Sequence, residues 1–124
     1  MANGRYAARI TAVSSTRRLV TFDVIQLFLG KAAATAAAQD HASEVPPPND
    51  VWIRNVSHLL RTLPVASGAP ITVNVLSASI TGDSTKNLPV TLTRLGQFED
   101  LKTGVFWLTV QGGVVTRIVE QYLP

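Results

Sequence analysis

Apolar and polar positions alternate loosely through the first part of the chain, and this pattern predicts two paired strands. Residues 5–13 read RYAARITAV and lead into the turn-forming cluster Ser14-Ser15-Thr16. Residues 18–25, RLVTFDVI, resume with β-branched residues, which favour the extended conformation. We expect an antiparallel pair joined by a polar turn, with Asp23 at a strand-to-helix junction.

The period of the apolar positions changes after this pair and predicts a helix. The apolar residues now recur at the spacing of one helix face: Ile25, Phe28, Leu29, Ala32, Ala33 and Ala36. Because alanine has the highest helix propensity, residues 26–39 are expected to form one helix. The small side chains of its second half would let that half approach a sheet closely.

The middle of the chain predicts a loop and then further strands. Asp40–Asp50 contains Pro46-Pro47-Pro48, a stiff connector that cannot lie inside a sheet. The later segments are assigned in chain order: residues 51–56 and 59–65 as a second strand pair, 71–80 as a strand, 81–87 as a polar turn and 89–98 as a short helix.

The end of the chain predicts a β-hairpin around Gly112-Gly113, a pair that suits a two-residue turn. On one face this turn places Val110 opposite Val115, Leu108 opposite Arg117, and Phe106 opposite Val119. On the other face it pairs Thr109 with Thr116 and Trp107 with Ile118. Since both faces carry large apolar residues, the hairpin should lie centrally in the sheet.

These elements define one α+β domain over residues 1–124. The chain is 46% hydrophobic and 15% charged, a composition that suits a folded core. Hairpin-length connections favour antiparallel pairing. We therefore expect a bent antiparallel sheet or small open β-barrel of about six to seven strands, with one main α-helix over residues 26–39.

Charge and apolar runs limit the classes of partner. The net charge is +3, and Arg5, Arg9, Arg17 and Arg18 stand near the start without an acid among them. This density of basic residues is low for a nucleic-acid surface, so nucleic acid is an unfavoured partner. No apolar run is long enough for a transmembrane segment, and no signal peptide is visible in this chain.

The sequence contains no established catalytic, metal or cofactor motif. There is no cysteine, and His41 and His58 lack the spacing of a zinc site, so no metal or cofactor is expected. Ser57 and His58 are adjacent, but neighbouring strand side chains point apart. Asp23, Asp50 and Glu120 remain as carboxylates of which two could converge for acid–base chemistry.

The stretch Val45–Val65 holds the main candidate binding residues, which are Trp52, Arg54, Asn55, Arg61, Asp50 and, from the second strand, Asp23. Two interpretations stay open: a binding surface, or a polar brace for the adjoining loop. In the brace, Arg54 would bond a carboxylate, with Asp50 or Asp23 as the expected acid. A barrel presenting Tyr6, Trp52, Arg54 and Arg61 could instead stack bases and contact phosphates, as OB-folds do.

Several phrases resemble a family of small, functionally uncharacterised actinobacterial domains, typically exported or lipoprotein-anchored. They are FDVIQLFLG…AAAQD, PPND with W-IRN, LRTLPV, FWLTVQGGVVTRI and EQYLP. The matching positions are Asp23, Gln26, Asn49, Asp50, Ile53, Arg54, Asn55, Leu60, Arg61, Thr62, Gly113, Glu120, Gln121 and Tyr122. Val51 and Trp52 stand where the family pattern has tyrosines. The resemblance implies an exported or cell-envelope protein, and it carries no catalytic residue set.

Three functional hypotheses follow. The first is a non-enzymatic binding or accessory domain of the bacterial cell envelope, whose partner is a protein or a wall polymer. The second is an OB-like nucleic-acid-binding module. The third is a small carboxylate-dependent hydrolase or isomerase. Because no set of catalytic residues is recognisable in the sequence, we favour the first hypothesis and expect that the protein is not an enzyme.

Overall fold

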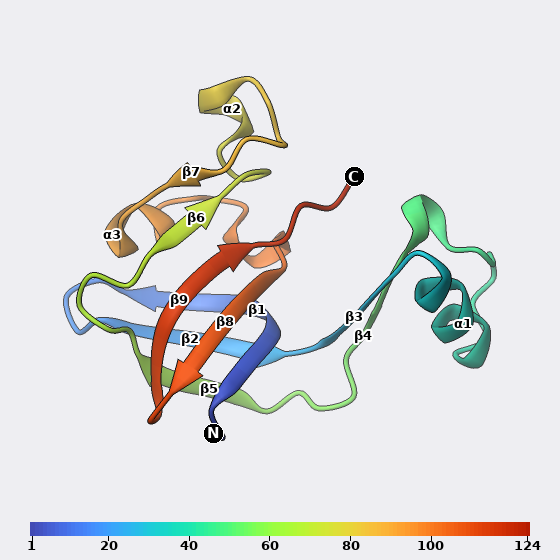
Figure 1. The fold of residues 1–124 in the computed structure, drawn as a ribbon, viewed down its shortest axis with the longest axis horizontal. Helices are drawn as coiled ribbons and strands as arrows, with labels where there is room; N and C mark the ends of the chain where they lie inside the picture. The colour runs from blue at the N-terminus through green and yellow to red at the C-terminus, as the bar shows by residue number, and fades with distance from the viewer.

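A computed structural model describes residues 1–124 as a strongly bent seven-stranded sheet, with a separate two-stranded ribbon beside it (Figure 1). The strand order in the large sheet is β5-β2-β1-β8-β9-β6-β7. Its strands are β1 (Gly4–Ser14), β2 (Leu19–Val24), β5 (Leu60–Pro64), β6 (Ile71–Val73), β7 (Leu88–Pro89), β8 (Phe106–Gln111) and β9 (Val114–Glu120). All neighbours are antiparallel except β6 and β9. The predicted α+β class and the bent antiparallel sheet are confirmed.

The core lies inside the bend of this sheet. Alternate residues of three central strands face it, as the strand period requires: Ala8 and Ile10 on β1, Val20 and Phe22 on β2, and Phe106, Leu108 and Val110 on β8. On β9 the core residues are Val115 and Ile118, which lie on either side of an irregularity in the strand pairing. Leu92 and Leu95 of the short helix α3 (Leu92–Leu95), together with Leu101 of η2 (Leu101–Thr103), close the core on its inner side.

The sheet approaches a barrel without closing. Just beyond β5, Val65 forms a parallel bridge with Val115 of β9, and Ala66 N donates to Val115 O at 2.8 Å. Arg18 fastens this junction by donating to the carbonyls of Val65 and Ala66 at 3.3 and 2.7 Å. The remainder of β5 has no further neighbour, so its outer edge stays free.

The two-stranded ribbon forms an arm that projects from the sheet, to the right in Figure 1. We call residues 26–54 the arm; its elements are β3 (Gln26–Leu29), α1 (Lys31–Gln39), η1 (Pro48–Asp50) and β4 (Val51–Arg54). A small apolar cluster of Ala7, Ile25 and Val105, flanked by Leu27 and Ile53, packs the root of the arm against the sheet.

The helix predicted over residues 26–39 is wrong in its first part. Gln26–Leu29 form β3, which pairs with β4, and the helix begins only at Lys31. Gly30 separates the two elements with φ 61° and ψ −131°, a backbone conformation that helix residues cannot adopt. The helix is therefore short, and it buries Ala33, Ala36 and Ala37 against the arm strands.

The second predicted strand pair is also wrong. Residues 51–54 pair with β3, and residues 60–64 pair with β2, so the two segments lie in different sheets. The intervening residues 55–59 have no regular secondary structure and connect the arm back to the sheet instead of forming a hairpin turn. Local β propensity identified both strands, but it carries no information about their partners.

The strand predicted over residues 71–80 ends at Val73, and residues 78–81 form the short helix α2 (Ala78–Thr81). The polar turn over 81–87 is present, and the predicted helix over 89–98 is reduced to α3, where Thr91 caps the first turn by accepting from Arg94 N. Buried Glu120 accepts hydrogen bonds from Asn74 N and Leu76 N, and thereby diverts the chain from the sheet after Val73.

The Gly112-Gly113 hairpin is confirmed, with positive φ at both glycines. Val110 lies opposite Val115 as expected. Beyond that pair the register differs by one residue, because Thr116 is an extra residue between Val115 and Arg117. Leu108 therefore faces Ile118 and Phe106 faces Glu120, while Arg117 moves to the face of Thr109.

Candidate functional site

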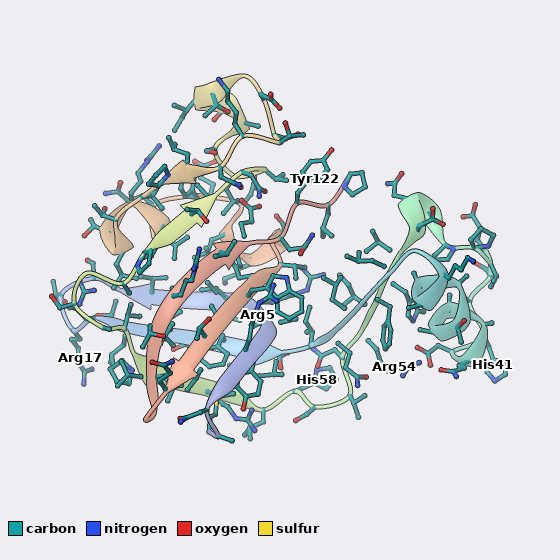
Figure 2. All side chains as sticks on the ribbon, viewed as in Figure 1. Arg5, Arg17, His41, Arg54, His58 and Tyr122 are labelled. Carbon is teal, nitrogen blue, oxygen red and sulfur yellow. The ribbon has the colours of Figure 1, made fainter.

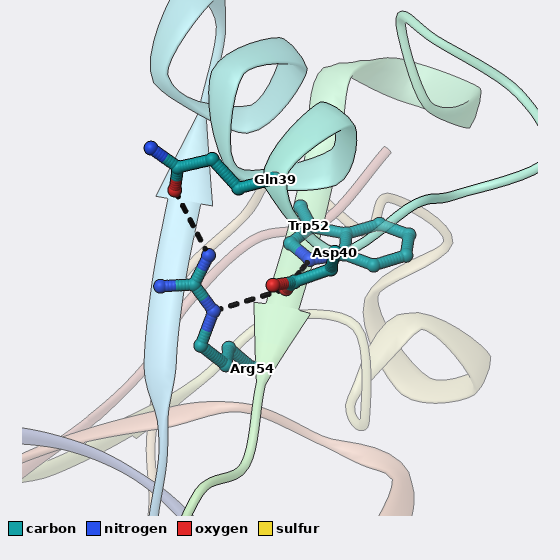
Figure 3. A network of polar contacts seen from close by, with 4 residues as sticks. All are labelled: Gln39, Asp40, Trp52 and Arg54. Carbon is teal, nitrogen blue, oxygen red and sulfur yellow. Dashed lines mark hydrogen bonds and ion pairs between the residues drawn. The ribbon is translucent and has the colours of Figure 1, made fainter.

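Arg54 fastens α1 to the arm strands through the carboxylate of Asp40 (Figure 3). Its Nε donates to Asp40 Oδ2 at 2.9 Å and its Nη2 donates to Gln39 Oε1 at 3.2 Å. Trp52 Nε1 donates to the same Asp40 oxygen at 2.8 Å. Arg54 is thus a brace, as one of the two interpretations expected. Its acid is Asp40, however, and the expectation of Asp50 or Asp23 is wrong.

The Asp40 clamp also sets the electrostatics at the end of α1. The hydrogen bond from Arg54 and then that from Trp52 hold the pKa of Asp40 below its ordinary range. The pair is partly solvated, since the Arg54 and Asp40 side chains are 26% and 33% exposed. Solvent screening keeps such a pair weak, so the clamp stabilises the arm modestly.

Asp50 serves the backbone of the arm and lies apart from the other candidates. Asn49 and Asp50 both adopt left-handed φ values, 58° and 54°. The Asp50 carbonyl accepts from Gly30 N at 3.0 Å, which closes the far end of the arm. Asn49 Nδ2 donates to Pro124 O at 3.1 Å and ties this turn to the C-terminal segment.

Asp23 and Asn55 join the sheet to the connection that leaves the arm. Asn55 Nδ2 donates to Asp23 Oδ2 at 2.6 Å. The remaining oxygens, Asp23 Oδ1 and Asn55 Oδ1, are buried without a hydrogen-bond partner in the protein. This pair fixes the path of residues 55–59 across the end of β2 and so positions the strand that follows.

Arg61 lies in a cleft of about 380 Å³ between the root of the arm and the edge of the sheet. The cleft is lined by Val24, Ile25, Gln26, Arg54, Val56, Ser57, Leu59 and Arg61. It therefore has two guanidinium groups and no carboxylate in its lining. Arg61 makes no hydrogen bond or ion pair to the protein, whereas Arg54 is held by Asp40. Figure 2 labels Arg54 at the end of β4 and His58 in the connection that follows it.

The edge of β5 beside this cleft presents free backbone groups. Val65 N donates to Arg18 O at 2.8 Å, and in an antiparallel ladder hydrogen-bonded pairs alternate. Leu63 and Arg61 consequently bond β2, while the N–H and C=O groups of Leu60 and Thr62 point away from the sheet. Large apolar side chains flank this edge: Val56, Leu59 and Leu60 are 77%, 60% and 54% exposed.

The three carboxylates considered for acid–base chemistry do not converge. Glu120 faces the core side of the sheet opposite Phe106, whereas Asp23 follows core-facing Phe22 and so faces the other side. Asp50 lies in the arm. His58, in the exposed connection, lines neither the arm cleft nor the cavity beside Glu120. The structure also brings together no group of three His, Cys, Asp or Glu side chains suited to a metal ion.

Two features escaped the sequence reasoning. On the outer face of the sheet, Arg5 and Arg117 flank Thr109 from the two neighbouring strands, and the Arg5 guanidinium lies 4.1 Å from the centre of the Trp107 ring. The bulge at Thr116 places Arg117 there, and no sequence signal marks that bulge. The other feature is Asp40, the acceptor for Arg54 and Trp52. It directly follows the helix, and nothing in the sequence distinguishes it from an acidic residue in a solvent-exposed loop.

The residues proposed for an OB-like surface are dispersed. Trp52 and Arg54 bond Asp40 in the arm, and Arg61 lines the cleft. Tyr6 packs against the core and donates to Ala2 O at 2.7 Å. These four side chains therefore do not form one stacking platform.

Comparison with protein-family models, with curated proteins and with solved structures finds no match to this chain. None of the helices is both long enough and apolar enough to cross a membrane. The resemblance to actinobacterial exported domains stays a prediction from the sequence.

Proposed function

We propose that the chain is a non-enzymatic binding module in which the edge of β5 captures an extended, acidic segment of a protein partner. The observation that carries this proposal is the free edge of β5 beside a cleft that holds Arg54 and Arg61 and no acid. Main-chain hydrogen bonds along a sheet edge supply affinity in this mode, and neighbouring side chains supply specificity.

The arrangement suits a peptide in three respects. Leu60 and Thr62 offer two donors and two acceptors at strand spacing. Exposed Val56, Leu59 and Leu60 provide apolar contacts beside them. Arg61, which is free of protein acids, supplies a planar guanidinium that can bind a carboxylate through two parallel hydrogen bonds. The resemblance to exported domains supports placing this module in the bacterial cell envelope.

Fluorescence anisotropy with a labelled peptide of alternating aspartate and valine tests the proposal. Thr62→Pro removes an outward N–H that β2 does not use, so it should abolish binding while the sheet stays folded. Thr62→Ala loses only the 2.8 Å hydroxyl contact with Thr21 and should bind like the wild type. Arg61→Gln should weaken binding roughly 10-fold and reduce its salt dependence.

Two results would overturn this function. Equal binding by the Thr62→Pro and Thr62→Ala variants would remove the edge from the mechanism. Equal binding of a matched lysine–valine peptide would remove the acidic specificity. Poly(glycerol phosphate), an anionic polymer that cannot add as a strand, distinguishes the wall-polymer alternative, because its binding should survive Thr62→Pro.

Nucleic-acid binding is a second candidate, supported by the outer sheet face and not by the residues first considered. Arg5 and Arg117 flank the Thr109 hydroxyl beside Trp107, and a cavity of about 320 Å³ lies over them. Titration with single-stranded oligonucleotides should then give binding that weakens steeply with salt and is lost in Arg117→Ala. Absence of binding at low salt would eliminate this candidate.

A further inference from the structure

Glu120 occupies a position unlike that of the other acids in the chain. It is the last residue of β9 and only 3% exposed. Its Oε1 accepts from Asn74 N at 2.6 Å and from Leu76 N at 3.2 Å. Its backbone carbonyl accepts from Asn74 Nδ2 at 3.1 Å, so both the main chain and one carboxylate oxygen are fixed.

The second carboxylate oxygen, Oε2, has no donor within the protein. Glu120 is one of the residues that line a cavity of about 260 Å³. Oε2 keeps some contact with solvent, but the burial of the side chain as a whole disfavours the ionised form and raises the pKa of Glu120. A ligand that donated a hydrogen bond or carried a positive charge would offset this effect of burial.

The walls of the cavity indicate the chemistry of such a ligand. Val75, Leu76, Val105 and Leu123 supply apolar surface. Asp100 is a second acid in the lining, and no lysine, arginine or histidine belongs to it. Ser79, Thr103 and Gln121 add polar side chains, but the cavity has no group of three His, Cys, Asp or Glu suited to a metal ion. An organic cation, in contrast, can use both the charge and the apolar walls.

We infer that this cavity binds a compact organic cation, in which an ammonium or guanidinium group bonds Glu120 and a short apolar body contacts Val75, Val105 and Leu123. The cavity shares no lining residue with the cleft beside β5, so this inference is independent of the proposed function. The same chemistry is presented by a free alkylamine and by a lysine side chain of another protein.

Titration of the intact chain with n-butylammonium, followed by amide chemical shifts, tests this inference. We expect saturable shifts at Val75, Leu76 and Val105, and none with equal n-butanol, which has similar bulk but no charge. Glu120→Gln keeps an acceptor for the two backbone amides and loses the charge, so its affinity for n-butylammonium should fall at least 10-fold. Glu44→Gln, the same substitution at an exposed position in the arm, should leave binding unchanged.

Leu123→Trp provides a second variant that fills the cavity from the C-terminal segment and should also abolish the shifts. Nα-acetyl-lysinamide distinguishes the two sources: shifts equal to those with n-butylammonium indicate a lysine of a partner, and shifts with the free amine alone indicate a small ligand. The inference is overturned if n-butylammonium gives no saturable shift, if n-butanol binds equally, or if neither Glu120→Gln nor Leu123→Trp weakens binding.

Discussion

Most of the candidate polar side chains form hydrogen bonds with other groups of the protein itself. Arg54 and Trp52 converge on Asp40, Asn55 holds Asp23, and Glu120 accepts two backbone amides. Most of the side chains that drew attention in the sequence are therefore committed to holding the arm and its connection. The side chains of Arg61 and Asp50 are exceptions, since neither makes a hydrogen bond or ion pair within the protein.

Arg54→Lys should lower the melting temperature by a few degrees and leave the fold intact. Lysine keeps the charge but cannot donate to both Asp40 and Gln39 from one planar group. Because the pair is partly exposed, the loss should be small. Thermal denaturation followed by circular dichroism measures it, with Arg17→Lys as an exposed control. A melting temperature unchanged in Arg54→Lys would show that the clamp contributes nothing to stability.

The stability of the protein should depend on pH through Glu120. Burial raises the pKa of this carboxyl above its ordinary value of 4.5, so the folded chain keeps a proton that the unfolded chain has already lost. The free energy of unfolding should consequently fall as the pH rises from 4.5 through the raised value. The pKa of Asp40 is lowered, so Asp40 stabilises the fold at higher pH. This stabilisation is lost as the pH falls below 3.8, the ordinary pKa of the group.

Urea denaturation between pH 4 and pH 7 separates these effects. Glu120→Gln cannot ionise, and its unfolding free energy should stay level where that of the wild type declines. Glu44→Gln should follow the wild type throughout. A parallel decline in Glu120→Gln would assign the pH dependence to another group.

At the scale of elements, the backbone conformation of a single residue determines where a strand ends and the following helix begins. Gly30 ends β3 and allows α1 to begin, with φ 61° and ψ −131°. No atom lies within 4 Å of a Cβ built at this position, so only the backbone opposes a side chain there.

Gly30→Ala should therefore destabilise the arm through backbone strain alone. The expected loss in unfolding free energy is about 1–3 kcal/mol. Lys31→Ala, at the next position and already helical, should change stability by less than about 0.5 kcal/mol. Equal stability of the two variants in urea denaturation would contradict the role assigned to Gly30.

The sequence predicted elements better than it predicted their partners. Alternation and β-branching correctly located the first strand pair, and Gly112-Gly113 located the final hairpin. The predicted helix wrongly included Gln26–Leu29, because Phe28 and Leu29 fit the apolar face of a helix as well as they fit a strand. Tertiary contacts with β4 decide that these residues form a strand. The bulge at Thr116 and the Arg54–Asp40 bond likewise depend on packing, which local patterns do not encode.

At the scale of the whole molecule, the open sheet leaves the outer edge of β5 available next to the root of the arm. Arg18 and the single bridge between Val65 and Val115 bring the two strands together at one point, and the rest of β5 does not pair with β9 (Figure 1). The Asn55–Asp23 pair and the apolar cluster of Ala7, Ile25 and Val105 hold the connection and the root of the arm beside this edge. Edge strands are usually protected by charge and proline, and β5 carries Arg61 and Pro64. A partner with acidic residues would convert Arg61 from a protecting charge into a specific contact.

Amide hydrogen exchange at Leu60 and Thr62, measured by NMR with and without the aspartate–valine peptide, tests the central claim most directly. The outward N–H groups of both residues should exchange rapidly in the free protein and become protected on saturation with peptide. The amides of Arg61 and Leu63, already bonded to β2, should change little. Protection confined to the outer face around Thr109, or an unchanged exchange rate at Leu60 and Thr62 in the saturated complex, would contradict capture along β5.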